Sequence, residues 1–383
     1  MLTSTSARLL VLVLAGALGL AACGGQPSAP APAAPTSAAT SAPANPTAAP
    51  APTAAATAAP TSAPAPTSAP TAAPAPTSAT LPASGMPGLA RGALSQRPYI
   101  VMIDNHPDAY PQTGLDRAAL VFEALAEFGV TRFMAVFAPG ISPDAPQIGP
   151  VRSTRLYFAQ WAIGFHALYA HAGGSPEGLE LVESTDQLVN LDALHNDGGG
   201  YFARSSDRDA PHNLYTSSAS LARAVKDRGV ADYPYTDVGF LFKPDAPVTQ
   251  RPDAQRLSYF FIYREDDAGW TYDPQTNGYL RLRRGQPARD AATGAQLWTK
   301  NVVVMEVKEA PIPGDPKGRI DQLVIGSGKA RVFVDGVERE VSWRKDAPEA
   351  PLGFFDAGGS EVELNAGPLW IVALPALENL TVK

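Results

Sequence analysis

The sequence predicts an α/β first domain with a central mixed sheet, followed by a β-rich second domain. Between residues 97 and 245, strand-like apolar runs alternate with helix-like runs, as in domains whose helices cover a sheet. From residue 257 to 383 the apolar runs are short and separated by turn residues. Residues 243–256 contain three prolines and mark the boundary between these two patterns.

The first domain begins with a buried strand that ends at Asp104. Its strands are predicted at 99–103, 120–123 and 132–137. Its helices are predicted at 153–165, 176–183 and 217–228. Ser175 and Pro176 suit the N-cap and first turn of the second helix, and Gly229 suits the end of the third.

The second domain consists of short strands. They are predicted at 259–263, 279–282, 302–307 and 370–374. Asp335 and Gly336 lie between β-forming residues and predict a tight hairpin. Most of its aromatic residues suit a core, so we expect this domain to support the first or to bind a partner.

Cys23 is the only cysteine, and it follows a short uncharged apolar segment. The run Leu20-Ala21-Ala22-Cys23 resembles the lipobox of bacterial lipoproteins, which implies that residues 1–23 are a signal peptide whose final cysteine becomes lipidated. The alternative is an ordinary secretory signal with a chance cysteine. The resemblance implies a lipid anchor on the extracytoplasmic face of the cell membrane.

Residues 24–96 are predicted to be a disordered tether. The segment is dominated by Ala, Pro, Thr and Ser, and no charged residue lies between Arg8 and Arg91. It has too little apolar surface to offset the entropy of folding, and its prolines favour extended geometry. The composition suits a spacer, and it would also allow O-glycosylation.

The folded part is acidic. The chain has a net charge of −7, and because only Arg8 precedes Arg91, the charge beyond the tether is one unit more negative, −8. Nucleic-acid binding depends on Lys and Arg neutralising phosphates, so we expect no nucleic-acid partner. A local basic pocket remains compatible with this charge.

Polar residues follow the first strand, where ligands bind in α/β sheets. Asp104 is a candidate ligand for Mg²⁺, and Asn105 and His106 are candidate hydrogen-bonding groups. The alternative is that Asp104 and Asn105 cap the next turn. The five histidines lack zinc-ligand spacing, so the sequence predicts no metal beyond a loosely held Mg²⁺.

Arg152 and Arg155 are predicted to share one face of the first turn of a helix. Guanidinium groups and free N–H groups at a helix start both bind anions, so this pair predicts an anion site. Surface salt bridging is the alternative.

Two further clusters complete the candidate pocket. His171 precedes the glycine pair Gly173 and Gly174, which suits either a ligand cradle or a buried histidine bonded to the backbone beside a turn. A later polar loop leads into a helix, and its candidate ligand-binding residues are Arg204, Arg208, His212 and Asn213.

These motifs resemble the YerB family of lipoproteins. The resemblance rests on residues 101–107, 131–136, 148–153, 171–175 and 211–216 and continues at 301–304, 326–329 and 364–371. It implies a lipoprotein with this architecture and assigns no biochemical activity.

The order of motifs is also similar to that of the LytR-CpsA-Psr phosphotransferases, which transfer glycopolymers from polyprenyl diphosphate. That similarity implies that Arg152, Arg155 and Arg204 grip a diphosphate while Asp104 helps to hold Mg²⁺. This chain has Arg152-Ser153 where that family has an Arg-Asp pair.

We therefore expect a lipoprotein that binds an anionic component of the cell envelope, such as a phosphorylated glycan or a lipid-linked precursor. Two alternatives stay open. One is a phosphoryl or glycopolymer transferase that uses the same pocket. The other is a module that docks an envelope protein through the second domain.

Overall fold

The computed structural model describes residues 86–383 except residues 198, 235, 265 and 266. The predicted signal peptide and most of the predicted tether lie outside the described residues. The described end of the predicted tether is part of the fold, because Leu89 and Leu94 are buried in the core and Ala90 pairs with Phe240. The folded part thus begins before residue 97.

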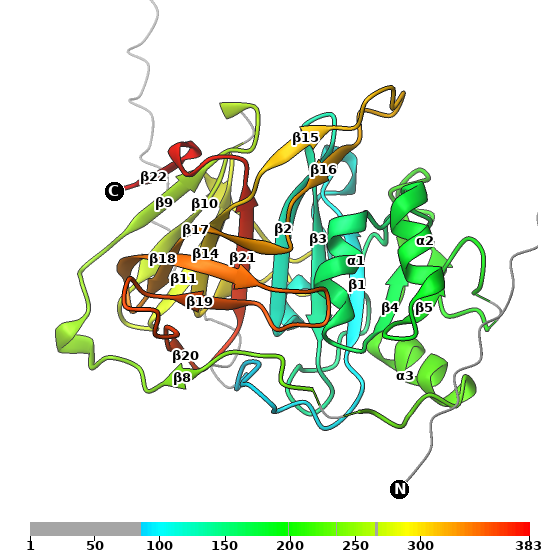
Figure 1. Ribbon diagram of the computed structural model, residues 1–383, viewed down its shortest axis with the longest axis horizontal. Coiled ribbons are helices and arrows are strands. Elements are labelled where there is room, and N and C mark those ends of the chain that lie inside the picture. Colours follow the sequence, from blue (N-terminus) through cyan, green and yellow to red (C-terminus); the bar gives the residue numbers. More distant parts are fainter. Residues whose placement is uncertain (1–85, 198, 235, 265–266) are drawn as a thin grey trace, which may run out of the picture. The chain divides into compact units, whose positions relative to one another are not determined.

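A ten-stranded mixed sheet organises the fold (Figure 1). In spatial order its strands are β19 (Gly353–Phe355), β18 (Val337–Lys345), β17 (Gly326–Val334), β14 (Asn301–Glu306), β21 (Leu369–Leu374), β2 (Leu120–Glu127), β3 (Val130–Phe137), β1 (Tyr99–Asp104), β4 (Leu168–His171) and β5 (Val189–Asp192). The predicted fold class is confirmed: α-helices lie only in the first part of the described chain, and strands dominate the second.

The sheet continues across the sequence boundary. β21 lies between β2 and β14 and is parallel to both. Its residue Ile371 is paired with Phe122 of β2 on one side and with Val303 of β14 on the other. The first and second parts of the chain therefore share one hydrogen-bonded sheet, which the sequence did not predict.

A second sheet has six strands. They are β12 (Gln286–Pro287), β11 (Gly278–Arg283), β10 (Ala268–Asp273), β9 (Arg256–Tyr259), β22 (Leu380–Val382) and, paired with β11, β13 (Trp298–Thr299). Three short pairs complete the strands: β15 (Glu309–Pro311) with β16 (Ile320–Gln322), β8 (Phe242–Lys243) with β20 (Leu364–Asn365), and β6 (Ala203–Arg204) with β7 (Leu214–Tyr215).

The large sheet has an apolar core on each face. The helices α1 (Leu156–Ile163) and α2 (Pro176–Ser184) cover one face, where Trp161 stacks on Phe122 of β2 with centroids 4.9 Å apart. The helix α3 (Ser218–Asp227) and the second sheet contribute to the core on the other face. There Trp270 meets Trp370 edge to face at 5.2 Å, so the two sheets pack through aromatic side chains.

Two predicted helices are confirmed, and one is shorter than predicted. Ser175 caps α2 with its hydroxyl oxygen, as expected, and Ser217 caps α3 in the same way. The helix predicted at 153–165 begins only at Leu156. Thr154 is held in an extended bridge to Gly174, and Arg155 has extended backbone angles. The prediction that Arg152 and Arg155 share a helical turn is therefore wrong.

Most predicted strands of the second part are confirmed, including the hairpin at Asp335 and Gly336, which joins β17 to β18 with positive φ angles of 55° and 74°. The strand predicted at 259–263 instead ends at Tyr259. Its pairing with β22 stops there, and Ile262 and Tyr263 are about half exposed. Within the described residues, no helix is long and apolar enough to cross a membrane.

Candidate functional site

The carboxylate of Asp104, at the end of β1, joins three parts of the chain. The side chain is buried, and its Oδ2 accepts hydrogen bonds from Nδ1 of His212 at 2.8 Å and from Nε of Arg152 at 3.1 Å. Its Oδ1 accepts from the backbone N–H of His106 at 3.1 Å. Asp104 thus holds an imidazole and a guanidinium group side by side.

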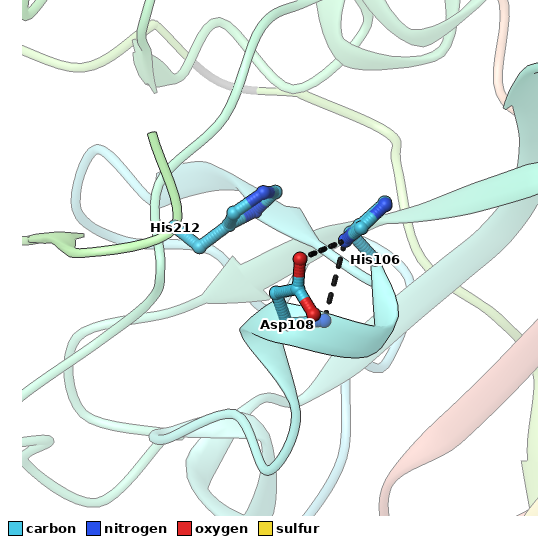
Figure 2. A group of neighbouring side chains, drawn as sticks. All are labelled: His106, Asp108 and His212. Atoms are coloured by element: carbon cyan, nitrogen blue, oxygen red, sulfur yellow. Dashed lines mark hydrogen bonds and ion pairs between the residues drawn. The ribbon is translucent and has the colours of Figure 1, made fainter. Parts of the chain in front are cut away.

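His106 and His212 form a stacked pair beside this carboxylate (Figure 2). Their ring centroids are 4.6 Å apart and their planes differ by 16°. Nδ1 of His106 accepts from the backbone N–H of Asp108 at 3.2 Å and lies 3.4 Å from a carboxylate oxygen of the same residue. One donor atom from each of these three residues lies within 4.8 Å of the others, so they form a candidate metal-binding cluster.

Arg208 positions the loop that carries His212. Its guanidinium donates to the carbonyl oxygens of Ala109 at 2.5 Å and Pro111 at 2.7 Å, which follow His106 in the chain. The two loops that supply the histidines are therefore tied together by one side chain.

Asn213 shapes the same loop from within. Its Nδ2 donates to the carbonyl oxygens of Ser205 at 2.9 Å and Arg208 at 3.0 Å, and its Oδ1 accepts from Arg204 at 2.7 Å. These contacts give Arg204, Arg208 and Asn213 a positioning role, and direct ligand contact by them stays a prediction.

Arg152 reaches the site from an extended segment. Its backbone N–H donates to the carbonyl of Met102, and the N–H of Asp104 donates to the carbonyl of Pro150, each at 2.9 Å. These bonds fix Arg152 beside the end of β1. The side chain of Arg152 is 27% exposed. Among the residues that the structure describes, it has a hydrogen-bond partner only at Nε.

Arg155 lies in a buried ionic cluster that the sequence analysis did not identify. Glu127 forms ion pairs with both Arg155 and Arg132 through its two carboxylate oxygens. Arg132 also donates to the carbonyl of Ser153 at 3.2 Å. Burial, with the nearby positive charge of Arg155, lowers the pKa of Arg132 to about 10.

Arg132 is the cross-strand neighbour of Asp104 in the pairing of β1 with β3. Arg132 is the charged residue of an otherwise apolar predicted strand. That charge could have revealed the ionic cluster from the sequence, because a buried arginine requires a partner.

His171, Gly173 and Gly174 lie in a separate, buried arrangement. The ring nitrogens of His171 contact the carbonyl of Gly173 and Oδ1 of Asn190, both at 3.0 Å. Burial lowers the pKa of His171, so the ring is neutral near pH 7. A Cβ on Gly174 would lie 2.7 Å from Cγ2 of Thr154. These contacts correspond to the second interpretation above, a buried histidine beside a turn.

Asn105 faces a different pocket from Asp104. Its Nδ2 donates to Oγ1 of Thr131 at 2.7 Å, and its Oδ1 accepts from Gln112 at 2.8 Å. It lines a pocket of about 110 Å³, to which Arg281 and Tyr263 also contribute and which Asp104 and His212 do not line.

A buried ion pair lies at this pocket. Glu123 of β2 accepts from Arg281 at 2.8 Å, from the hydroxyl of Tyr259 at 2.8 Å and from the indole of Trp370 at 3.0 Å. Glu123 and Arg281 have side-chain exposures of 1% and 4%, so the pair joins the two sheets inside the protein.

Comparisons with known proteins agree with the resemblance found in the sequence. Residues 83–231 match the N-terminal domain, and residues 258–371 the C-terminal domain, of the family DUF3048, which is described as being of unknown function. YerB of Bacillus subtilis (strain 168), a protein named as a lipoprotein, is 30% identical over 290 residues, which is 75% of this chain and 84% of that protein. A crystal structure of YerB from Bacillus subtilis matches with a TM-score of 0.66 and 28% identity, covering 75% of this chain and 94% of that one.

Proposed function

The chain belongs to the DUF3048 protein family, and we propose that it is a membrane-anchored lipoprotein that binds an anionic component of the cell envelope. The anchor is supported by the run Leu20-Ala21-Ala22-Cys23 and by the relative that is named a lipoprotein. A lipidated Cys23 would hold the folded part on the extracytoplasmic face, at the end of the tether.

The observation that carries the binding proposal is the arrangement of Arg152. Asp104 holds it by Nε, so its two Nη groups are available at a partly exposed surface beside His212. Such a fork matches two oxygens of a phosphate or carboxylate.

The charges around Arg152 are balanced. Arg132 and Arg155 share the carboxylate of Glu127, Arg152 contacts that of Asp104, and the exposed carboxylate of Asp108 lies in the neighbouring histidine cluster. The binding proposal therefore rests on the two Nη groups of Arg152 and not on a net positive charge. A phosphorylated glycan or a lipid-linked precursor is the class of envelope ligand that combines such an anion with a location near the membrane.

Titration of the purified full-length protein in detergent tests this proposal. The ligands are pyrophosphate and a soluble polyprenyl-diphosphate analogue, both in the presence of a chelator. We expect saturable binding that Arg152→Gln weakens at least about tenfold, which corresponds to the loss of one charge-assisted contact. Arg339→Gln is the matched control, because Arg339 is exposed on β18, near the other end of the large sheet.

The outcomes separate the alternatives. No saturable binding by the folded native protein would contradict the proposal and favour a module that docks an envelope protein. Binding followed by release of phosphate or transfer of the glycan would identify a transferase that uses the same pocket.

A further inference from the structure

We propose that His106, Asp108 and His212 form a binding site for a divalent transition-metal ion such as Zn²⁺. One donor atom from each residue lies within 4.8 Å of the others, and the three side chains are neighbours (Figure 2). The ligands come from two loops that lie more than one hundred residues apart in the sequence, which is why their spacing gives no zinc motif.

The types of donor favour zinc over magnesium. Two imidazole nitrogens and one carboxylate oxygen are the donors that Zn²⁺ and its neighbours in the first transition row prefer, whereas Mg²⁺ requires oxygen donors and keeps most of its water. Three protein ligands would leave a fourth position for water or for another ligand.

Binding an ion requires a local rearrangement. Donors at about 2.0–2.1 Å from a tetrahedral zinc ion are about 3.3 Å from each other, so no two donors need to approach by more than about 1.5 Å. The nearly parallel rings of His106 and His212 must also tilt toward the ion, because a ring nitrogen binds a metal in the plane of its ring, and Nδ1 of His106 can bind it only by releasing the N–H of Asp108. The Asp108 side chain is 73% exposed and that of His106 is 38% exposed, so both have room to move toward a bound ion.

The hydrogen bond from His212 to Asp104 supports the metal site independently of the distances between the ligands. The carboxylate of Asp104 accepts from Nδ1 of His212, so that nitrogen carries the proton and Nε2 presents its lone pair. A carboxylate that orients a histidine in this way is the usual support behind a metal-binding imidazole. Arg152 in turn fixes the carboxylate by donating to the same oxygen. In this arrangement Asp104 supports the metal site without being a ligand itself.

Metal titration of the full-length protein, without a histidine tag and stripped with a chelator, tests the site. Calorimetry with Zn²⁺ and visible absorption with Co²⁺ report stoichiometry and ligand geometry. We expect one equivalent of Zn²⁺ to bind, with a Co²⁺ spectrum typical of a four-coordinate site, and Mg²⁺ in large excess not to displace it.

Matched variants locate the ion. His106→Gln and His212→Gln should each lower the zinc affinity at least about tenfold, since each removes one of three ligands. His195→Gln should leave it unchanged, because His195 is a 63% exposed histidine that is bonded to Asp192 and is outside the cluster. Circular dichroism establishes that every variant is folded.

Two results would overturn the proposal. One is zinc binding by the folded native protein that is no tighter than that of the double variant His106→Gln/His212→Gln. The other is an equal loss of affinity in His195→Gln. The metal titration contains no anionic ligand, and the anion titration contains a chelator that removes metal. Failure of the metal proposal can therefore be distinguished from failure of the anion proposal.

Discussion

Nδ1 of His212 donates a hydrogen bond of 2.8 Å to the carboxylate of Asp104, a residue 108 positions earlier in the chain. The same carboxylate oxygen accepts from Arg152. The protein thus concentrates one acidic, one imidazole and one guanidinium group at the end of β1, and this contact supports both proposals above.

Asp104→Asn should weaken zinc binding about 10–100-fold. The asparagine amide is uncharged, so it is a weaker hydrogen-bond acceptor for His212 and Arg152 than the carboxylate. Calorimetry with Zn²⁺ measures the change. Asp253→Asn, on an exposed aspartate, is the control. Equal affinities in the native protein and Asp104→Asn would show that the carboxylate does not support the imidazole.

Arg208→Gln should loosen the loop that carries His212, since the arginine donates to the carbonyls of Ala109 and Pro111. We expect faster amide hydrogen exchange in residues 204–213 and weaker zinc binding, with the remaining protein unchanged. The control is Arg223→Gln, because Arg223 also donates to two carbonyl oxygens, those of Gly199 and Gly200. Unchanged exchange in residues 204–213 would contradict the positioning role.

Glu123→Gln should lower the free energy of unfolding by about 3–5 kcal/mol, because it leaves the buried Arg281 without its counter-charge. Urea denaturation measures this loss. Glu340→Gln is the control, since its side chain is 83% exposed and its ion pair with Arg331 is a surface contact. A loss below about 1 kcal/mol would mean that the pair contributes little to joining the two sheets.

His171 should make the protein less stable in mild acid. Burial lowers its pKa in the folded state, whereas a histidine in the unfolded chain has a pKa of about 6.5. As the pH falls below 6.5 the unfolded state takes up a proton before the folded state does, so the free energy of unfolding decreases. Urea midpoints at pH 7.5 and 5.5 measure the effect, and His171→Gln should reduce the difference between them. Identical pH dependence in the two proteins would refute the assignment.

Cys23→Ala should release the protein from the membrane fraction of bacteria that express it and abolish incorporation of labelled fatty acid. Ser28→Ala, five residues later, should leave both unchanged. Retention of Cys23→Ala in the membrane fraction would contradict the lipid anchor.

The strands could be predicted because their signals are local. The apolar run at 99–103 predicts a strand and the Asp335-Gly336 pair predicts a tight turn, and each prediction needs only the residues of that segment. The position of β21 between β2 and β14 could not be predicted, because pairing between Phe122 and Ile371 depends on which distant edges are available when the sheet closes.

The sequence identified individual residues of the site but not their contacts with one another. Asp104, His106 and His212 were each identified from local context, but their contact depends on the loop that Arg208 ties down. The helix start near Arg155 was predicted too early, since the bridge from Thr154 to Gly174 overrides the local helical pattern.

The central place of β21 has a consequence for how the chain folds as it is made. Until residues 369–374 are available, β2 has an open edge in the middle of the future sheet, and such an edge readily pairs with other chains. Closing it joins residues about 250 positions apart, a type of contact that slows folding. A polypeptide that is truncated before β21 would therefore be a target for aggregation and proteolysis.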